Sequence, residues 1–144
     1  MKPVTIDDVK QFTFPNLGDD RGSLVVIEAG ENKILPFEIK RIFYMWGADT
    51  DSIRGQHANK LSTFCLINVC GESTVKVIGQ DGREQIYNLS APNMGLYIPA
   101  MLWKDMYNFS NDSILLVLAD THYDKTEYIT DLEEYLALVG EING

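Results

Sequence analysis

Between residues 20 and 120, short apolar runs are separated by turn residues. Ser73–Ile78 and Glu84–Leu89 alternate apolar and polar side chains, which is the pattern of a strand with one buried face. The Asp-Gly pair between these runs suits a turn with positive φ, so the two runs predict a β-hairpin. Residues 62–70 are mostly apolar, which is typical of a strand buried on both faces. The same reasoning predicts further strands at residues 23–29, 39–46, 95–98, 102–109 and 113–119.

The spacing of these runs, roughly 8–12 residues from one to the next, favours a sandwich or barrel of antiparallel strands. The tail of the chain has a different period, because Tyr128, Leu132 and Tyr135 stand at helical spacings with acidic residues between them. Residues 126–138 therefore predict an amphipathic helix. We expect one domain over residues 1–144, all-β, built as a jelly-roll (cupin) β-sandwich with a C-terminal α-helix.

Acidic residues outnumber basic ones by 21 to 12, which gives a formal net charge of −9. Phosphate neutralisation by Lys and Arg dominates nucleic-acid binding, so this charge argues against a nucleic-acid ligand. The basic residues fall mainly in the first 60 positions and at Lys104, which still allows a local anion-binding pocket. No apolar run approaches the ~20 residues of a membrane span, and the N-terminus lacks the pattern of a signal peptide. We expect a cytoplasmic protein that does not enter a membrane.

Two cysteines, Cys65 and Cys70, lie within the apolar run at residues 62–70. Their odd spacing places them on opposite faces of a strand, where they are poorly placed for a mutual disulfide. We therefore expect two buried thiols in a reducing compartment.

The sequence Arg-Gly-Gln-His-Ala-Asn-Lys at residues 54–60 combines an imidazole, a carboxamide and two cations just before a strand-like run. In an extended backbone the side chains at i and i+2 point to the same face, so His57 and Asn59 would face one pocket. Arg54 or Lys60 would be near enough to hold an anion. The segment favours proton transfer on a phosphorylated substrate.

Several blocks of sequence occur together in this chain: DRGSL at 20–24, IKR at 39–41, RGQHANK at 54–60, GLYIP at 95–99, WKDM at 103–106 and HYD at 122–124. Their content and order resemble the sugar 3,4-ketoisomerases, WxcM-like cupins that act on dTDP-4-keto-6-deoxyglucose. The resemblance covers residues 20 to about 130. It implies a jelly-roll enzyme without metal or redox cofactor, usually a homodimer, that serves the synthesis of 3-amino-3,6-dideoxyhexoses for surface polysaccharides.

Two positions depart from the pattern of this family. The best-known members of the family carry a second histidine, usually held to be the catalytic base, where this chain has Asn59. A carboxamide cannot accept a proton at neutral pH, so that base is absent here. Some relatives have His where this chain has Lys104. The positions of Arg21 and Lys104 vary between relatives that give different C4 stereochemistry, which leaves the product epimer open.

Moving a ketone from C4 to C3 of a sugar requires a proton to leave C3 and a proton to reach C4 through an enediol. An imidazole suits both steps because its ordinary pKa is ~6.5. We assign the main acid/base role to His57, with Tyr97 as a residue that shares it. The enediol oxygen needs a donor, for which Lys104 or Asn59 is suited. The other substrate-binding candidates are Arg21, Arg41 and Arg54 for the diphosphate, Lys60 for an anion, and Tyr44 or Phe43 for stacking on thymine.

Metal-dependent cupins use a cluster of His with a Glu, and this chain has only His57 and His122, so we expect no metal. Two other functions remain open. The loss of the second histidine also fits a non-catalytic dTDP-sugar-binding domain. The same enolisation chemistry also serves a 3,5-epimerase-like enzyme acting on the same substrate.

Overall fold

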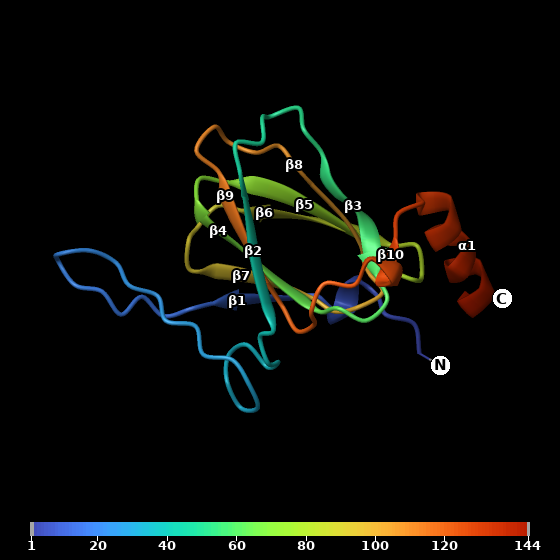
Figure 1. Ribbon diagram of the computed structural model, residues 1–144, viewed down its shortest axis with the longest axis horizontal. Coiled ribbons are helices and arrows are strands. Elements are labelled where there is room, and N and C mark those ends of the chain that lie inside the picture. The colour runs from blue at the N-terminus through green and yellow to red at the C-terminus, as the bar shows by residue number, and fades with distance from the viewer. Residues whose placement is uncertain (1, 144) are drawn as a thin grey trace.

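The computed structural model describes residues 2–143 and consists of two five-stranded antiparallel sheets with a helix at the C-terminal end (Figure 1). The strand orders are β1-β7-β4-β9-β2 in one sheet and β10-β3-β8-β5-β6 in the other. The strands are β1 (Lys10–Thr13), β2 (Arg41–Trp46), β3 (Arg54–Asn59), β4 (Phe64–Cys70), β5 (Ser73–Ile78), β6 (Glu84–Leu89), β7 (Met94–Ile98), β8 (Trp103–Tyr107), β9 (Ile114–Ala119) and β10 (Tyr128–Ile129). The helical elements are the 3-10 helices η1 (Ile6–Asp8) and η2 (Lys125–Glu127) and the α-helix α1 (Leu132–Asn143).

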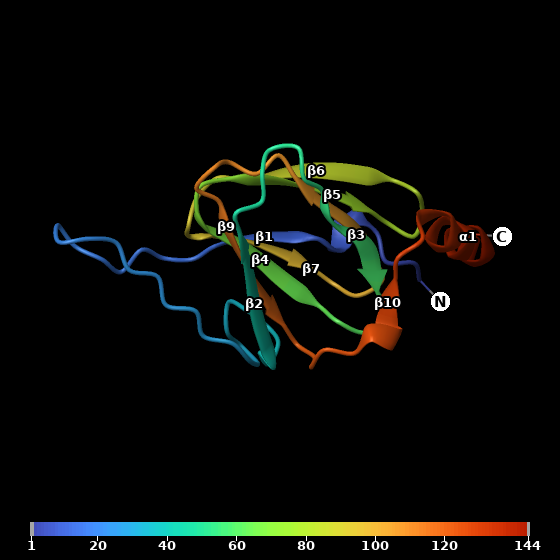
Figure 2. The same ribbon diagram turned by 45° about the horizontal axis from the view of Figure 1, so that its top comes forward.

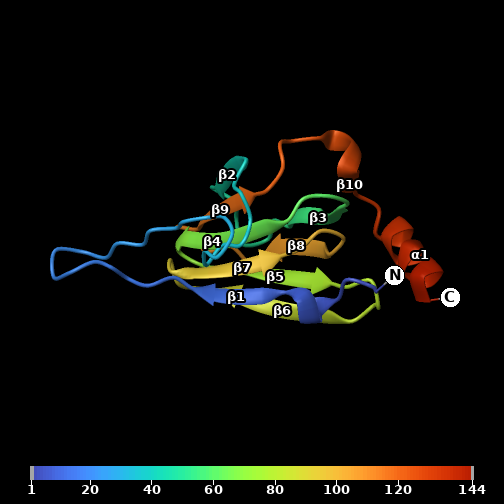
Figure 3. The same ribbon diagram turned by 90° about the horizontal axis from the view of Figure 1, so that it is seen from below.

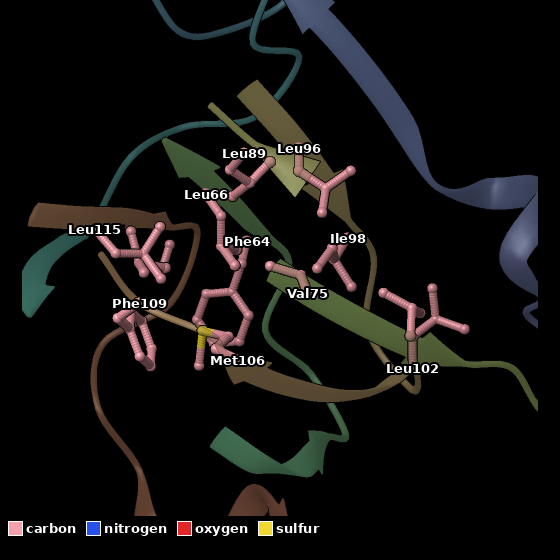
Figure 4. Close-up of a cluster of buried hydrophobic side chains, with 13 residues drawn as sticks. Phe64, Leu66, Val75, Leu89, Leu96, Ile98, Leu102, Met106, Phe109 and Leu115 are labelled. Atoms are coloured by element: carbon pink, nitrogen blue, oxygen red, sulfur yellow. The ribbon is translucent and has the colours of Figure 1, made fainter. Parts of the chain in front are cut away.

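The main hydrophobic core fills the space between the two sheets (Figure 4). It joins Phe64 and Leu66 of β4 in one sheet to Val75 of β5 and Met106 of β8 in the other. The alternation of apolar and polar side chains along the strands explains this arrangement, because every second residue points inward. The jelly-roll architecture expected from the sequence is confirmed.

Strand β4 is buried on both faces, as its apolar sequence predicts. Its alternate side chains Cys65 and Ile67 belong to a second cluster with Phe14 and Leu35. This second cluster lies on the outer face of the sheet, where Phe14 and apolar residues of the segment between β1 and β2, among them Leu35, cover it. The strand that supports one wall of the core is therefore held from both sides.

Residues 15–40, called the arm below, run out from the sandwich between β1 and β2 as a long irregular excursion (Figure 3). The prediction of a ladder strand at residues 23–29 is wrong, because only the isolated bridge between Ala29 and Leu35 involves this stretch. The apolar sequence is present, but no strand within residues 2–143 pairs with it. The sequence pattern did not identify β1, which pairs with β7, or β10, which pairs with β3.

The C-terminal helix begins later than the sequence predicts. The residues 126–138 are divided among η2, β10 and α1. Strand β10 lies beside β3, with Tyr128 opposite Asn59 in the ladder (Figure 2), and this pairing outweighs the helical period of the sequence. Helix α1 is then fixed to the sandwich by Tyr135, whose Oη donates to the carbonyl oxygen of Ile78 at 2.9 Å.

The two cysteines differ in their surroundings. Cys65 is fully buried, and this burial raises the pKa of its thiol to about 12. Cys70 is exposed, which corrects the prediction of two buried thiols, because the ladder between β4 and β9 shifts register just before it. Both thiols are free. In the part of the chain that the structure describes, no helix has the length and apolar character that a membrane crossing needs.

Candidate active site

A cavity of about 340 Å³ lies between the sheets, against β2, β4 and β9 on one side and β3 and β8 on the other. Its apolar lining comprises Phe43, Met45, Ile53, Phe64, Leu66, Met106 and Val117, and its polar side chains are Arg54, His57 and Lys104. A concave, mostly apolar space with a few converging polar groups is the usual form of a small-molecule site. The two strands that carry the polar groups, β3 and β8, are neighbours in one sheet.

A β-bulge in β3 sets the direction of His57. Gly55 pairs with Asp105 of β8, and the next pair is His57 with Lys104, which leaves Gln56 as an extra residue. Gly55 has φ 79° and Gln56 has φ 55°, both in the left-handed region. A Cβ on Gly55 would lie 2.9 Å from the backbone oxygen of Lys104, so glycine permits both the backbone angle and the close approach. His57 consequently stands directly opposite Lys104.

Three buried side chains form a hydrogen-bonded chain next to His57, called the lysine cluster below. Lys104 is only 2% exposed, and its Nζ donates to Asn59 Oδ1 and to the carbonyl oxygen of Leu102, both at 3.3 Å. Asn59 is fully buried, and its Nδ2 donates to a carboxylate oxygen of the buried Glu127. A positive and a negative group are thus linked through a neutral amide, without an ion pair between them.

Burial in this cluster changes the protonation of both titratable cavity groups. The pKa of Lys104 falls to about 7, because desolvation disfavours the ammonium more than the charge of Glu127 favours it. The pKa of His57 falls to about 4, mainly through burial and then through the charge of Lys104, despite hydrogen bonds that the imidazole donates to the Gly55 backbone and the Asn59 side chain, which act in the opposite direction. At neutral pH the imidazole is therefore uncharged, and the amine is close to its midpoint.

Arg41 lies beside the cavity, and two nitrogens of its guanidinium lack a hydrogen-bond acceptor among residues 2–143. Its carbon Cζ is 5.3 Å from the ring centroid of Phe43, 5.8 Å from that of Phe64 and 5.7 Å from that of Tyr123. Its Nε and Nη2 are buried and have no hydrogen-bond partner among the described residues. Lys104 Nζ is 4.9 Å from the same Phe64 ring. Two cations therefore meet at one aromatic side chain, and Arg41 keeps donors available for an anion.

The structure brings together five of the residues that the sequence selects: Arg41, Arg54, His57, Asn59 and Lys104. Asn59 does not line the cavity, although the sequence predicts that it faces the same pocket as His57. Its Nδ2 donates to Glu127, its Oδ1 accepts from Lys104, and its side chain also hydrogen-bonds to His57.

Tyr97, predicted to share the acid/base role, does not line the cavity that holds His57. Its neighbours Leu96 and Ile98 on β7 belong to the core between the sheets. The alternation of the strand turns Tyr97 to the outer face, where its ring centroid is 5.8 Å from that of Phe12 and 6.2 Å from that of Phe37.

Three predicted binding residues are also absent from the cavity lining. Tyr44 points to the outer face of β2 and stacks at 5.8 Å on Trp46, while Phe43 takes the inward position. Lys60 is exposed, because Asn59 takes the inward position on β3 and alternation turns Lys60 to solvent. Arg21 is on the arm, where its guanidinium pairs with Asp19 at 2.6 Å, so one chain does not deliver it to this cavity.

Two site residues were not identified from the sequence, Glu127 and Tyr128. Glu127 stands 68 positions from Asn59 in the sequence and reads as one of the acids of the expected helix. The ring of Tyr128 lies 4.8 Å from that of His57, and Tyr123 lies 5.9 Å from Tyr128. The only sequence signal near them is the HYD block at residues 122–124.

Comparison with known proteins identifies the family of this fold and cavity. Residues 7–140 match the family model described as WxcM-like, C-terminal (FdtA). The chain is also 38% identical over 135 residues to a TDP-4-oxo-6-deoxy-alpha-D-glucose-3,4-oxoisomerase from Aneurinibacillus thermoaerophilus, covering 93% of this chain and 94% of that protein. This chain belongs to the WxcM-like FdtA family.

Solved structures of family members extend the match. A 3,4-ketoisomerase from Helicobacter canadensis is 40% identical, with a TM-score of 0.86 over 92% of this chain and 98% of that one. A histidine-to-asparagine variant of the 3,4-ketoisomerase QdtA from Thermoanaerobacterium thermosaccharolyticum is 32% identical, with a TM-score of 0.86 over 93% and 95%. That variant was solved in complex with TDP-4-keto-6-deoxyglucose. These relatives place the chain among sugar 3,4-ketoisomerases.

Proposed function

We propose that this protein converts dTDP-4-keto-6-deoxyglucose to a dTDP-3-keto-6-deoxyhexose as a sugar-nucleotide 3,4-ketoisomerase. The observation that carries the proposal is the placement of an uncharged imidazole beside a buried lysine in one cavity. The identity of 38–40% with 3,4-ketoisomerases over more than nine-tenths of the chain supports the same reaction.

In this proposal His57 moves the proton between the two carbons. The neutral imidazole accepts the C3 proton, and the resulting imidazolium then returns a proton to C4. A positioned acid/base of this kind contributes about 10²–10⁴-fold in rate. Its neighbour Tyr128 limits the orientation of the ring.

The anionic half of the substrate meets the arginines. Arg54 lines the cavity and Arg41 offers unsatisfied donors at its edge, so we assign both to the diphosphate. The inward ring of Phe43 is the candidate for stacking on thymine, since Tyr44 faces outward. Arg21 stays outside this assignment because the arm holds it away from the cavity of its own chain.

The reaction needs no redox cofactor, since the ketone at C4 is reduced as the alcohol at C3 is oxidised. Within residues 2–143, no three His, Cys, Asp or Glu side chains gather as metal ligands do. The family resemblance supports a place in the synthesis of 3-amino-3,6-dideoxy sugars for surface polysaccharides, in the cytoplasm.

A homodimer is part of the proposal. The outer face of β2 exposes Ile42 (58%), Tyr44 (58%) and Trp46 (71%) in a row. Alternate large apolar side chains on an edge strand form a surface that a second copy can cover. Sedimentation or light scattering of the purified protein tests this, and a monomer at micromolar concentration contradicts it.

Proton NMR of dTDP-4-keto-6-deoxyglucose incubated with the pure protein in D2O tests the activity. We expect deuterium in the sugar together with a 3-keto product, and the C4 signal then reports the epimer. Deuterium at C3 or C5 without ketone migration would indicate an epimerase instead. Tight dTDP-sugar binding without any exchange would indicate a binding module.

A further inference from the structure

Lys104 is placed differently from a lysine that only holds an anion. Its Nζ contacts a carboxamide oxygen and a backbone carbonyl oxygen, both neutral, and lies over the face of Phe64. The carboxylate of Glu127 reaches it only through Asn59. A directly paired carboxylate would keep the ammonium charged, whereas this spacing leaves the amine free to lose its proton. The cluster thus allows Lys104 to exchange a proton and not only to supply charge.

We propose that Lys104 is a second catalytic residue, which carries the proton that must move from the O3 to the O4 oxygen of the sugar. This rests on the proposed ketoisomerase activity. A 3,4-isomerisation moves two protons: one passes from C3 to C4, and the other passes from the C3 hydroxyl to the new C4 hydroxyl. His57 transfers the first and Lys104 transfers the second.

The steps balance without any further reactant. As His57 removes the C3 proton, the C3–H electron pair forms the C3=C4 bond and the ammonium of Lys104 protonates O4, which gives a neutral enediol. As the imidazolium of His57 returns its proton to C4, the amine of Lys104 accepts the proton of O3, and the C3 carbonyl forms. At the end His57 is neutral and Lys104 is charged, as at the start.

The positions of His57 and Lys104 allow each residue to carry one of the two protons. His57 and Lys104 are directly opposite in the β3–β8 ladder, so their side chains stand on one face with Cβ atoms about 4.5–5.5 Å apart. Both line the same cavity, so the C3–C4 edge of one sugar can face both groups at once.

The charged and titratable groups that influence Lys104 come from three elements around it. His57 and Arg54 on β3, Arg41 on β2 and Glu127 on η2 are its charged or titratable neighbours. Burial lowers the pKa of Lys104 to about 7, and Glu127 limits that fall. A group with this pKa can give and take a proton near neutral pH, which an arginine cannot do.

The variant Lys104→Arg separates proton transfer from charge. The wild type is assayed first in D2O, and absence of a 3-keto product there would overturn the proposed function before this inference is tested. In Lys104→Arg we expect ketone migration to fall by about 10²-fold or more, while exchange of the C3 proton with solvent falls much less and dTDP binding stays within a few-fold. Lys76→Arg, in the neighbouring strand β5, is the matched control with unchanged turnover.

Three results would overturn the inference. Retained isomerisation in Lys104→Arg would show that charge alone suffices. Parallel loss of exchange and migration would assign Lys104 to the carbon proton. The third result comes from a second variant, Glu127→Gln, which keeps Lys104 itself. This variant tests the inference even if Lys104→Arg does not fold. Loss of the carboxylate lowers the pKa of Lys104 further, so the alkaline limb of kcat/KM against pH must move to lower pH, and an unmoved limb contradicts the proposal.

Discussion

Two buried asparagines, at opposite ends of the sandwich, are satisfied in different ways. Asn59 is at the end of β3 beside β10, and Asn68 is near the end of β4 (Figure 1). Asn68 Nδ2 donates to Ser113 Oγ at 2.8 Å, and its Oδ1 accepts from Ser73 Oγ. Asn59 binds a lysine and a carboxylate instead.

The difference separates a structural network from a functional one. The neutral groups around Asn68 satisfy one another at little electrostatic cost. The charges around Asn59 must be taken out of water, which destabilises the folded chain unless their interactions compensate. Neutral side chains at these positions would avoid this desolvation cost. Because the lysine cluster lies next to His57 at the cavity, we infer that its charged groups serve the reaction and not the stability of the fold.

The largest expected effect is a loss of turnover when His57, the residue next to the lysine cluster, is replaced. His57→Asn removes the group that accepts the C3 proton, so isomerisation should fall by about 10²–10⁴-fold, with dTDP affinity within a few-fold of wild type. Ser113→Ala, in the network of Asn68, is the control and should keep its turnover per folded molecule. NMR turnover assays and dTDP titrations check both. Retained activity in His57→Asn would remove His57 as the base.

The second expected effect is a pH dependence of stability that Lys104 and His57 produce and the neutral network around Asn68 does not. The pKa of Lys104 in the folded chain is about 7, below its ordinary 10.5, so between these values the unfolded chain holds the proton more strongly. The free energy of unfolding should therefore rise with pH across this window. His57, with a pKa lowered from 6.5 to about 4, should produce a second rise between pH 4 and 6.5.

Urea unfolding at a series of pH values measures this dependence. Lys104→Met should remove the upper rise, while Lys76→Met, a partly exposed lysine of β5, should keep it. An unchanged upper rise in Lys104→Met would show that another group causes it.

Removing each asparagine tests the comparison directly. Asn59→Ala and Asn68→Ala both leave buried polar partners unsatisfied, which costs about 1–3 kcal/mol per group and more where the group is charged. We expect the larger loss in free energy of unfolding for Asn59→Ala, since Glu127 and Lys104 both lose a partner. Only Asn59→Ala should also lower turnover of the folded protein. Equal effects on turnover would contradict the separation of the two networks.

The sequence predicts some secondary-structure elements of this fold correctly and others not. Alternation and apolar runs identify the strands from β4 to β9, because those strands lie in one continuous core. The period at residues 126–138 misleads, because pairing of Tyr128 and Ile129 with β3 outweighs helical propensity. Residues 23–29 have the composition of a strand, but none of the described strands pairs with them.

The candidate site also contains residues that the sequence predicts and residues that it does not. The block at residues 54–60 points to His57, since the residues that set its direction are local, including Gly55 in the bulge. The roles of Asn59 and Lys104 depend on Glu127, which is remote in sequence and reaches them only through the β10–β3 pairing. Spacing alone cannot reveal such a contact. Alternation could have warned that Tyr97, between two core residues, faces outward.

The smallest expected effects compare two glycines, one near each asparagine. Gly55 and Gly71 have φ 79° and 67°, where an L residue costs about 1–2 kcal/mol. A Cβ added to Gly55 would also come too close to the backbone oxygen of Lys104, and a Cβ added to Gly71 would come too close to Ser110 Oγ. Both alanine variants should be less stable in urea unfolding. Only Gly55→Ala should lower turnover, because it displaces the strand that carries Lys104, and equal turnover in the two variants would contradict this.

The exposed position of Trp46 on β2 makes its fluorescence separable from that of the second tryptophan, Trp103. Of the two tryptophans in the chain, Trp46 is 71% exposed, whereas Trp103 is 3% exposed and its indole Nε1 donates to Asp105 Oδ1 at 3.1 Å. Iodide will quench the emission of Trp46 unless another surface covers β2. The blue-shifted emission of Trp103, the residue next to Lys104, will report on the strand that carries the lysine. One fluorescence spectrum can thus follow assembly and the integrity of the cavity wall as independent events.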